Sequence, residues 1–213
     1  MRFVLTEEQA ALRDALDGVI SSSDPSSVWS RLDDLGINDL VAEATPVEVV
    51  ITFEALGRHA VEDAVASVAG VADDGELATL ATAAYLLGAG ERVLTDTVAY
   101  AKQRRQFGRE IGSYQAIKHK LADVRIALDF ARPLVFGAAL AIGPRSVSAA
   151  KVQAGEAAYL ASRTGLQVHG AIGYTRELEL SRWITLIREL QSAYGTAAYH
   201  RRRILDSLLA ERA

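Results

Sequence analysis

The residues best suited to chemistry lie in one stretch, Tyr100–Val124, where one apolar helical pattern ends and another begins. Arg104, Gln106 and Phe107 fall within a single turn there, directly before Gly108. An arginine fork pairs with phosphate through two parallel hydrogen bonds, and a neighbouring aromatic ring can stack on a flat ligand. The grouping therefore indicates binding of an anionic, planar ligand. The alternative is a basic helix end that the helix dipole stabilises.

Other kinds of chemistry have weaker support. The chain has no cysteine, which excludes disulfides, thiolate nucleophiles and cysteine zinc sites. The histidines at positions 59, 119, 169 and 200 lack metal-ligand spacing, so we predict no metal site. His169 lies beside a glycine turn and could meet a phosphate, although a hydrogen-bonded packing histidine is the commoner arrangement.

The composition limits the kinds of partner. The chain has 213 residues, half of them hydrophobic, and its net charge of −4 argues against a general nucleic-acid binder. The start shows no secretion signal, and no run approaches the roughly 20 apolar residues of a membrane span. We therefore expect a soluble, cytoplasmic protein that binds neither nucleic acid nor membrane.

Apolar spacing and turn residues predict an all-α fold. Capping boxes begin helices at Thr6 and Thr45, and Ser113 can cap another long helix. Further helices are expected over about 76–104, 146–168 and 196–209, with a glycine turn at 170–175. A short helix should carry Trp29 and Leu32 and end at Gly36, and another should begin near Leu178 and be interrupted near Gly195. We predict a shortened N-terminal helical region (1–60), a linker (61–75) and a C-terminal bundle of about four or five helices (76–213).

Two interruptions of the helical pattern carry structural predictions. Gly88 and Gly90 lie inside the helix that begins near Glu76, and each lowers helix propensity by up to about 1 kcal/mol. A close approach of two helices would offset that cost. Pro133 lies inside the next helix and should kink it or displace one backbone hydrogen bond.

Two motifs identify a family. The stretch YAKQRRQFGREIGSYQAIKHKLAD (100–123) resembles the most recognisable signature of the acyl-CoA dehydrogenase family, and QVHGAIGY (167–174) resembles its second glycine motif. Tyr194-Gly195-Thr196 follows at the spacing where that family has Glu-Gly-Thr. The N-terminal pattern, LTEEQ and then FEALGR (53–58), resembles the family's first helical domain in shortened form.

The resemblance implies a shared cofactor site. In the family, the residues that match Arg104, Phe107 and Gln167 reach across a subunit interface and hold the pyrophosphate and adenosine of an FAD bound mainly by the neighbour. By analogy, the same place would be lined by Gln106, Ile111, Tyr114, Val168 and Gly170.

Two departures from the family pattern bear on activity. Family members carry a β-rich domain between their helical parts, and here only the linker of residues 61–75 stands in its place. The family's base is a glutamate, whereas this chain has Tyr194 at that position and Ala78 at the alternative one. Glu76 is offset by two residues, which turns it away on a helix. Tyrosine, with an unperturbed pKa near 10, is a poor base, and filling of a vacated pocket is its favoured role.

These departures lead to one main expectation and two alternatives. The chain would be a non-catalytic subunit of a heteromeric acyl-CoA dehydrogenase, completing the FAD site of a full-length partner. The complex would be a heterotetramer that degrades steroid or lipid acyl-CoA. One alternative is a flavin-free assembly protein with the same bundle. The other is a self-sufficient enzyme that uses Tyr194 or Glu76.

Overall fold

The computed structural model describes residues 5–23, 27–34, 36–37, 43–61, 75–175 and 177–211. Its α-helices are α1 (Glu7–Ser21), α2 (Val28–Asp34), α4 (Pro46–Arg58), α6 (Gly75–Gln103), α7 (Gln115–Leu140), α8 (Pro144–His169), α9 (Ser181–Leu190) and α10 (Ala197–Ala210). Two short strands, β1 (Arg105–Gln106) and β2 (Arg109–Glu110), form a hairpin, and the 3-10 turns are η1 (Ile111–Ser113) and η2 (Gly170–Tyr174). The all-α prediction is confirmed, and the small hairpin is an addition to it.

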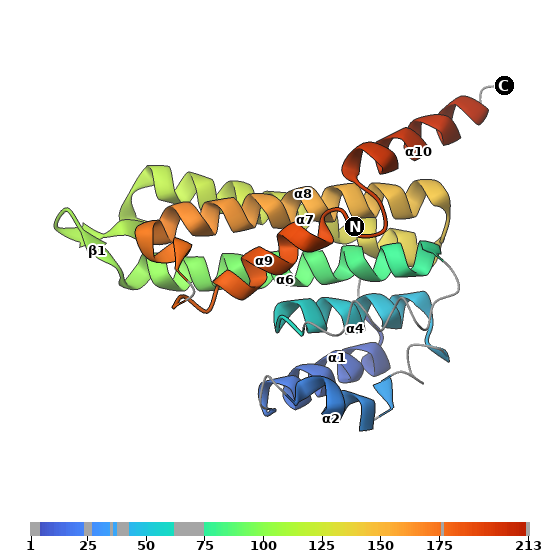
Figure 1. The fold of residues 1–213 in the computed structure, drawn as a ribbon, viewed down its shortest axis with the longest axis horizontal. Helices are drawn as coiled ribbons and strands as arrows, with labels where there is room; N and C mark the ends of the chain where they lie inside the picture. Colours follow the sequence, from blue (N-terminus) through green and yellow to red (C-terminus); the bar gives the residue numbers. More distant parts are fainter. Residues whose placement is uncertain are drawn as a thin grey trace.

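The long helices form a layered bundle. In Figure 1, α6, α7 and α8 run side by side, α9 lies along them, and α4 followed by α1 and α2 extends the stack on the α6 side. Side-chain bonds connect these layers: the Trp183 indole on α9 donates to the Gly57 carbonyl at 3.1 Å, and the Tyr85 hydroxyl on α6 donates to the Val61 carbonyl at 3.2 Å. The N-terminal region and the bundle therefore share one core.

The two predicted capping boxes are present. Thr6 accepts a hydrogen bond from the Gln9 main chain, and the Gln9 side chain accepts one from the Thr6 main chain. Thr45 and Glu48 make the equivalent reciprocal pair at the start of α4. Each pair satisfies donors that the first turn of a helix leaves open, so local sequence determines where these helices begin.

Close helix packing at the α6 glycines is also confirmed. A Cβ placed on Gly88 would lie 1.9 Å from the Glu54 carbonyl oxygen of α4. A Cβ on Gly90 would lie 3.2 Å from the Ala158 Cα of α8. The two glycines thus let α6 approach a different neighbour on each side, which offsets their unfavourable helix propensity.

Some local expectations were wrong or fall outside the described residues. Tyr114, not Ser113, precedes α7 as its cap residue, and the Ser113 hydroxyl instead donates to the Glu110 carbonyl at 2.7 Å. Pro133 lies inside α7 and does not end it, and the expected kink or displaced hydrogen bond stays a prediction. The expected linker lies almost wholly in residues 62–74, which are not described. No helix in the described ranges combines the length and apolarity needed to cross a membrane.

Candidate functional site

The hairpin between α6 and α7 presents an aromatic ring to solvent. Its strands pair Arg105 with Glu110 and Gln106 with Arg109, so Phe107 and Gly108 form the two-residue turn. Both turn residues have positive φ, 55° and 85°. Such a turn suits glycine but is strained for phenylalanine. Phe107 is 92% exposed, so packing within this chain does not explain why a strained aromatic residue stands there.

Tyr114 fixes the shape of this hairpin. Its hydroxyl donates to the carbonyl oxygens of Gln106 and Phe107, at 3.2 Å each. The Arg109 guanidinium lies over the Tyr114 ring, 4.0 Å from its centre. The Ile111 amide donates to the Arg104 carbonyl at 2.8 Å and closes the base of the hairpin. The turn is therefore held in place by contacts on both sides.

We expect Tyr114→Phe to loosen the hairpin without destabilising the bundle. Two exposed hydrogen bonds are lost, which should cost about 1 kcal/mol of local stability. Exchange of the Ile111 amide should become about fivefold faster, because 1.4 kcal/mol corresponds to a tenfold change. Hydrogen exchange measures this, with Tyr159→Phe on α8 as control. Unchanged exchange at Ile111 would show that Tyr114 does not hold the turn.

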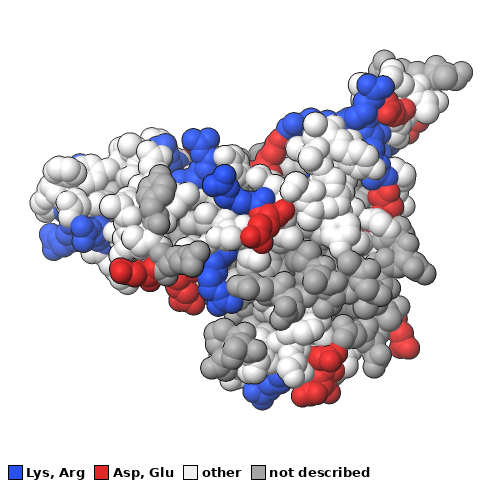
Figure 2. Space-filling view, in the orientation of Figure 1, with Lys and Arg blue, Asp and Glu red and all other residues white. Residues whose placement is uncertain are grey.

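Arg104 stands free beside the hairpin. Its side chain is exposed and makes no hydrogen bond or ion pair with a residue that the structure describes. The neighbouring Arg105 makes only a long contact to Glu110, at 3.8 Å. Figure 2 shows basic side chains at the end of the molecule where the hairpin protrudes. This end therefore offers guanidinium donors to an external anion.

The end of α8 supplies the second motif. Gln167 is exposed, and Gly170 takes a positive φ of 68° as the chain turns into η2. His169 is buried, its Nδ1 lies 2.8 Å from the Gly165 carbonyl, and its ring stacks on Tyr100 with centres 4.2 Å apart. His169 therefore packs the glycine turn against the end of α6, close to where the hairpin begins.

A groove of about 790 Å³ follows this end of α8 and α7. Among the residues that line it are Lys120, Leu160, Arg163, Gln167, Gly170 and Ala171. Two expected contacts, Gln167 and Gly170, meet here, whereas the hairpin residues stand outside the groove. Lys120 and Arg163 were not anticipated, although Arg163 precedes Gln167 by one helical turn and shares its face.

Val168 differs from the other expected contacts. Its side chain is only 7% exposed and faces the core. Any contact from Val168 to a ligand would therefore come from its main chain. Ile111 and Tyr114 are half-buried at the base of the hairpin, and Gln106 is exposed on β1.

The positions that would hold a catalytic base contain no free carboxylate. Tyr194 has a positive φ of 55° and packs partly against the core, and its carbonyl oxygen lies 3.1 Å from His200 Nε2. Ala78 is buried, and Glu76 is ion-paired with Arg203 of α10. Proton abstraction needs a positioned acid–base side chain within reach of the substrate, whereas these positions hold a tyrosine, an alanine and an ion-paired glutamate.

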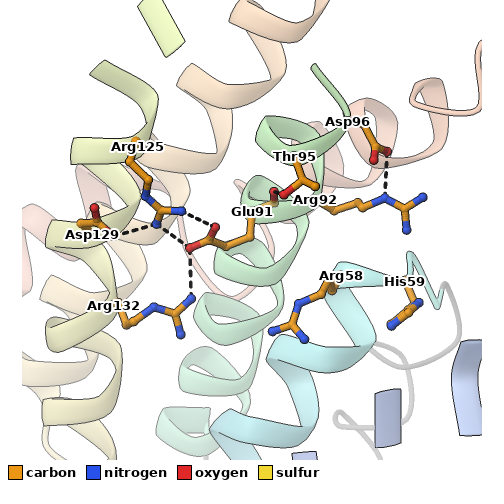
Figure 3. Close-up of a pocket in the computed structure, with 9 residues that line it drawn as sticks. All are labelled: Arg58, His59, Glu91, Arg92, Thr95, Asp96, Arg125, Asp129 and Arg132. Carbon is orange, nitrogen blue, oxygen red and sulfur yellow. Dashed lines mark hydrogen bonds and ion pairs between the residues drawn. The ribbon is translucent and has the colours of Figure 1, made fainter. Parts of the chain in front are cut away.

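A cavity of about 820 Å³ is lined mainly by charged groups that pair with one another. Glu91 accepts from Arg125 at 2.6 and 2.7 Å and from Arg132 at 3.0 Å (Figure 3). Arg132 also donates to Glu54 at 3.0 Å. Burial alone would raise the pKa of Glu91, but Arg125 and Arg132 outweigh it and hold that pKa below its usual value. Glu91 is therefore a poor base, and the cluster serves to join α4, α6 and α7.

The chain is similar to known proteins of one family. Residues 76–209 match the family described as "Acyl-CoA dehydrogenase, C-terminal domain". The chain is 43% identical over 111 residues to acyl-CoA dehydrogenase IpdE2 of Mycobacterium tuberculosis, covering 52% of this chain and 34% of that one. It is 30% identical over 139 residues to the caffeyl-CoA reductase-Etf complex subunit CarC of Acetobacterium woodii, covering 63% and 37%.

Solved structures agree with the sequence relatives. Butyryl-CoA dehydrogenase from Megasphaera elsdenii superposes with a TM-score of 0.60 at 28% identity, over 70% of this chain and 38% of that one. The matched part of the chain thus spans about a third of the length of its curated relatives, 34% for the first two.

Proposed function

Because the chain belongs to the acyl-CoA dehydrogenase family, whose C-terminal domain it matches over residues 76–209, we propose that it is a non-catalytic subunit of a heteromeric acyl-CoA dehydrogenase. Its hairpin would complete the FAD site of a full-length partner. The observation that carries this proposal is the pairing of a free Arg104 with a strained, 92% exposed Phe107 at one end of the bundle.

The residues at this end fit part of a flavin nucleotide. Arg104 would bind the pyrophosphate, Phe107 would stack on a flat ring, and Gln167 would hydrogen-bond the nucleotide from the groove. FAD, when bound, supplies the acceptor for hydride from the acyl chain. This chain's residues would hold and orient the cofactor, while the partner would supply the base and cover the flavin ring.

The lack of a base supports a division of labour. The positions for it hold Tyr194, Ala78 and an ion-paired Glu76. The best use of Tyr194 is as packing for its loop, since its ring lies partly against the core. The relative CarC is named as a subunit of a complex, which also favours a partner for this chain.

An unpartnered apolar face on α7 further supports a helical partner. Its exposed side carries Ile126, Phe130, Leu134 and Leu140, which are 52%, 67%, 41% and 69% exposed. These residues follow helical spacing on the side opposite the buried Leu128 and Val135. A helix that is apolar on both sides needs a neighbour on both sides. A heterotetramer in which α7 packs on the partner's bundle would meet this need.

The substrate would be an acyl-CoA thioester, oxidised between its α and β carbons. The relative in Mycobacterium tuberculosis is named acyl-CoA dehydrogenase IpdE2. A steroid-derived or other lipid acyl-CoA is the substrate class that we propose for the complex, with the thioester bound mainly by the partner.

Co-expression tests the proposal. The tagged chain is produced alone and together with candidate full-length members of the family from its host, and the purified material is examined for visible flavin absorption and for acyl-CoA oxidation. We expect no flavin on the chain alone and a yellow, active complex with the correct partner. Leaving this chain out should lower both the flavin content and the activity of the partner.

Two outcomes would contradict the proposal in different ways. If the chain alone carries stoichiometric flavin and oxidises thioesters, it is a self-sufficient enzyme, and Tyr194→Phe should then abolish its activity. If a complex forms but the partner holds FAD and turns over equally well without this chain, the chain is an assembly protein.

A further inference from the structure

A buried lysine on α8 lacks a counter-ion. Lys151 is only 3% exposed, and its Nζ donates to the carbonyl oxygens of Leu190 and Gln191, at 3.0 and 3.2 Å, where α9 ends. It makes no ion pair with any residue in the described ranges. A buried ammonium without an opposite charge is costly. Burial accordingly lowers the pKa of Lys151 to about 8.

A pocket of about 320 Å³ opens beside this lysine, between α8, α9 and the start of α10. Among its lining residues are Lys151, Gly155, Arg188, Ser192 and Thr196. Arg188 is exposed and, like Lys151, has no ion-pair partner among the described residues. Glu156 also lines the pocket, but Arg201 pairs with it. The unpaired charges that face the pocket are therefore both positive.

The start of α10 adds to this positive character. Thr196 caps the helix, accepting from the Tyr199 amide at 3.2 Å, and Ala197 lines the pocket. The first amides of a helix are open donors at the positive end of its dipole. Lys151 has three donors and uses two on carbonyls, so one N–H remains. Two cations, a helix start and the Ser192 hydroxyl thus surround one small space.

The geometry points to a binding site for a phosphate group in this pocket, held by Lys151, Arg188 and the first turn of α10. The group would be free inorganic phosphate or the phosphate of a small metabolite. A dianion would supply the charge that both side chains lack. The site does not depend on the proposed role of the hairpin, which protrudes at the other end of the bundle from α10 (Figure 1).

Phosphate binding to the purified full chain tests the site. Isothermal titration and thermal unfolding are measured with inorganic phosphate and with ADP, in sodium chloride of matched ionic strength. We expect binding that Lys151→Met abolishes and that Arg188→Gln weakens at least tenfold. Tighter binding of ADP would identify a phosphorylated metabolite, and tighter binding of inorganic phosphate would identify the free ion. Binding of neither probe would overturn the proposal.

Gly155 provides a variant that blocks the pocket without removing charge. A Cβ at this position meets nothing within 4 Å, and leucine is a far better helix former than glycine. Gly155→Leu should therefore fold at least as well as the wild type and lose phosphate binding. Arg202→Gln is the matched control, because Arg202 pairs with Asp206 on the exposed side of α10 and does not line the pocket. Wild-type binding by Gly155→Leu and Lys151→Met would refute the site.

Lys151 should make the stability of the phosphate-free protein depend on pH. The folded pKa of Lys151, about 8, lies below its ordinary value of 10.5. Between these two pH values the unfolded chain therefore binds more protons than the folded chain. The free energy of unfolding should rise as the pH increases from about 8 to about 10.5. Phosphate should flatten this rise by favouring the charged lysine, and Lys151→Met should lack it.

Other charged groups near Lys151 titrate elsewhere or are paired. Burial, and then the charge of Lys151, lowers the pKa of His200 on α10. His200 therefore stays neutral above pH 8. Glu156 forms an ion pair with Arg201, and Glu76 forms one with Arg203. A rise that persists unchanged in Lys151→Met would mean that Lys151 does not carry the pH dependence.

Discussion

Replacing Gly88 with alanine is expected to lower the free energy of unfolding by about 3–5 kcal/mol. The added Cβ would lie 1.9 Å from the Glu54 carbonyl oxygen and 3.0 Å from the Arg58 amide nitrogen, and both atoms belong to the α4 main chain. Because a main chain cannot move aside as a side chain can, α4 and α6 would have to separate. For a chain of this size the melting temperature should fall by about 6–20 °C.

Thermal unfolding followed by circular dichroism measures this effect, and Gly137 provides the control. Gly137 lies within α7, and a Cβ there meets nothing within 4 Å. Gly137→Ala should therefore leave stability unchanged or raise it by up to about 1 kcal/mol. Gly57→Ala probes the same contact from α4, since its Cβ would lie 2.1 Å from the Tyr85 carbonyl oxygen. If Gly88→Ala melts with the wild type, the two helices are not in such close contact.

The same contact explains how the N-terminal region stays attached to the bundle. Glu54 touches Gly88 through its main chain, while its carboxylate pairs with Arg58 and Arg132 at 3.0 and 2.9 Å. The pair with Arg58 lies within α4, whereas the pair with Arg132 joins α4 to α7. Glu54 therefore attaches α4 to α6 through its main chain and to α7 through its carboxylate.

Local chemistry made much of this fold predictable from sequence. The boxes at Thr6 and Thr45 each place a side-chain oxygen and its partner within four residues, so they could be recognised without tertiary information. Gly88 and Gly90 indicated close helix packing because glycine otherwise weakens a helix. What sequence could not reveal was which helices they approach, since Glu54 and Ala158 are far away along the chain.

Features that depend on tertiary structure were missed. Lys151 lies in an alanine-rich helix and reads as a solvent-facing residue, but the end of α9 covers it. Ser113 has the residue type of a helix cap, yet η1 uses it to bond Glu110, and the helix begins one residue later. The hairpin strands are only two residues long, too short to produce an alternating pattern.

The candidate site was predictable in its residue types more than in its arrangement. Phe107 and Arg104 are both exposed beside the turn, so an external ligand can reach them. The burial of Val168 depends on which side of α8 faces the core, and the groove at Lys120 and Arg163 needs two helices to form. The cofactor contacts themselves stay a prediction.

Replacing Arg104 with alanine in the complex should weaken FAD binding about 100-fold. Arg104 would donate charge-assisted hydrogen bonds to the pyrophosphate, and such bonds contribute about 1.5–3 kcal/mol each. A loss of about 2.8 kcal/mol corresponds to two factors of ten. Because the Arg104 side chain makes no bond within the described part of this chain, its removal should leave the fold and the assembly intact. Flavin fluorescence during titration of the apo-complex with FAD measures the affinity.

Arg105→Ala and Arg104→Lys separate a specific contact from a general effect of charge. Arg105→Ala removes the same charge from the next residue, which makes only a 3.8 Å contact to Glu110, and should leave FAD affinity within about threefold of the wild type, as expected for screened surface charge. Arg104→Lys keeps the charge but loses the planar fork, so its affinity should fall between the other two. Equal losses for both alanine variants would mean that only the overall positive charge of the hairpin matters. Full flavin occupancy in Arg104→Ala would instead mean that the wild-type chain keeps the family's helical bundle but does not contribute to FAD binding.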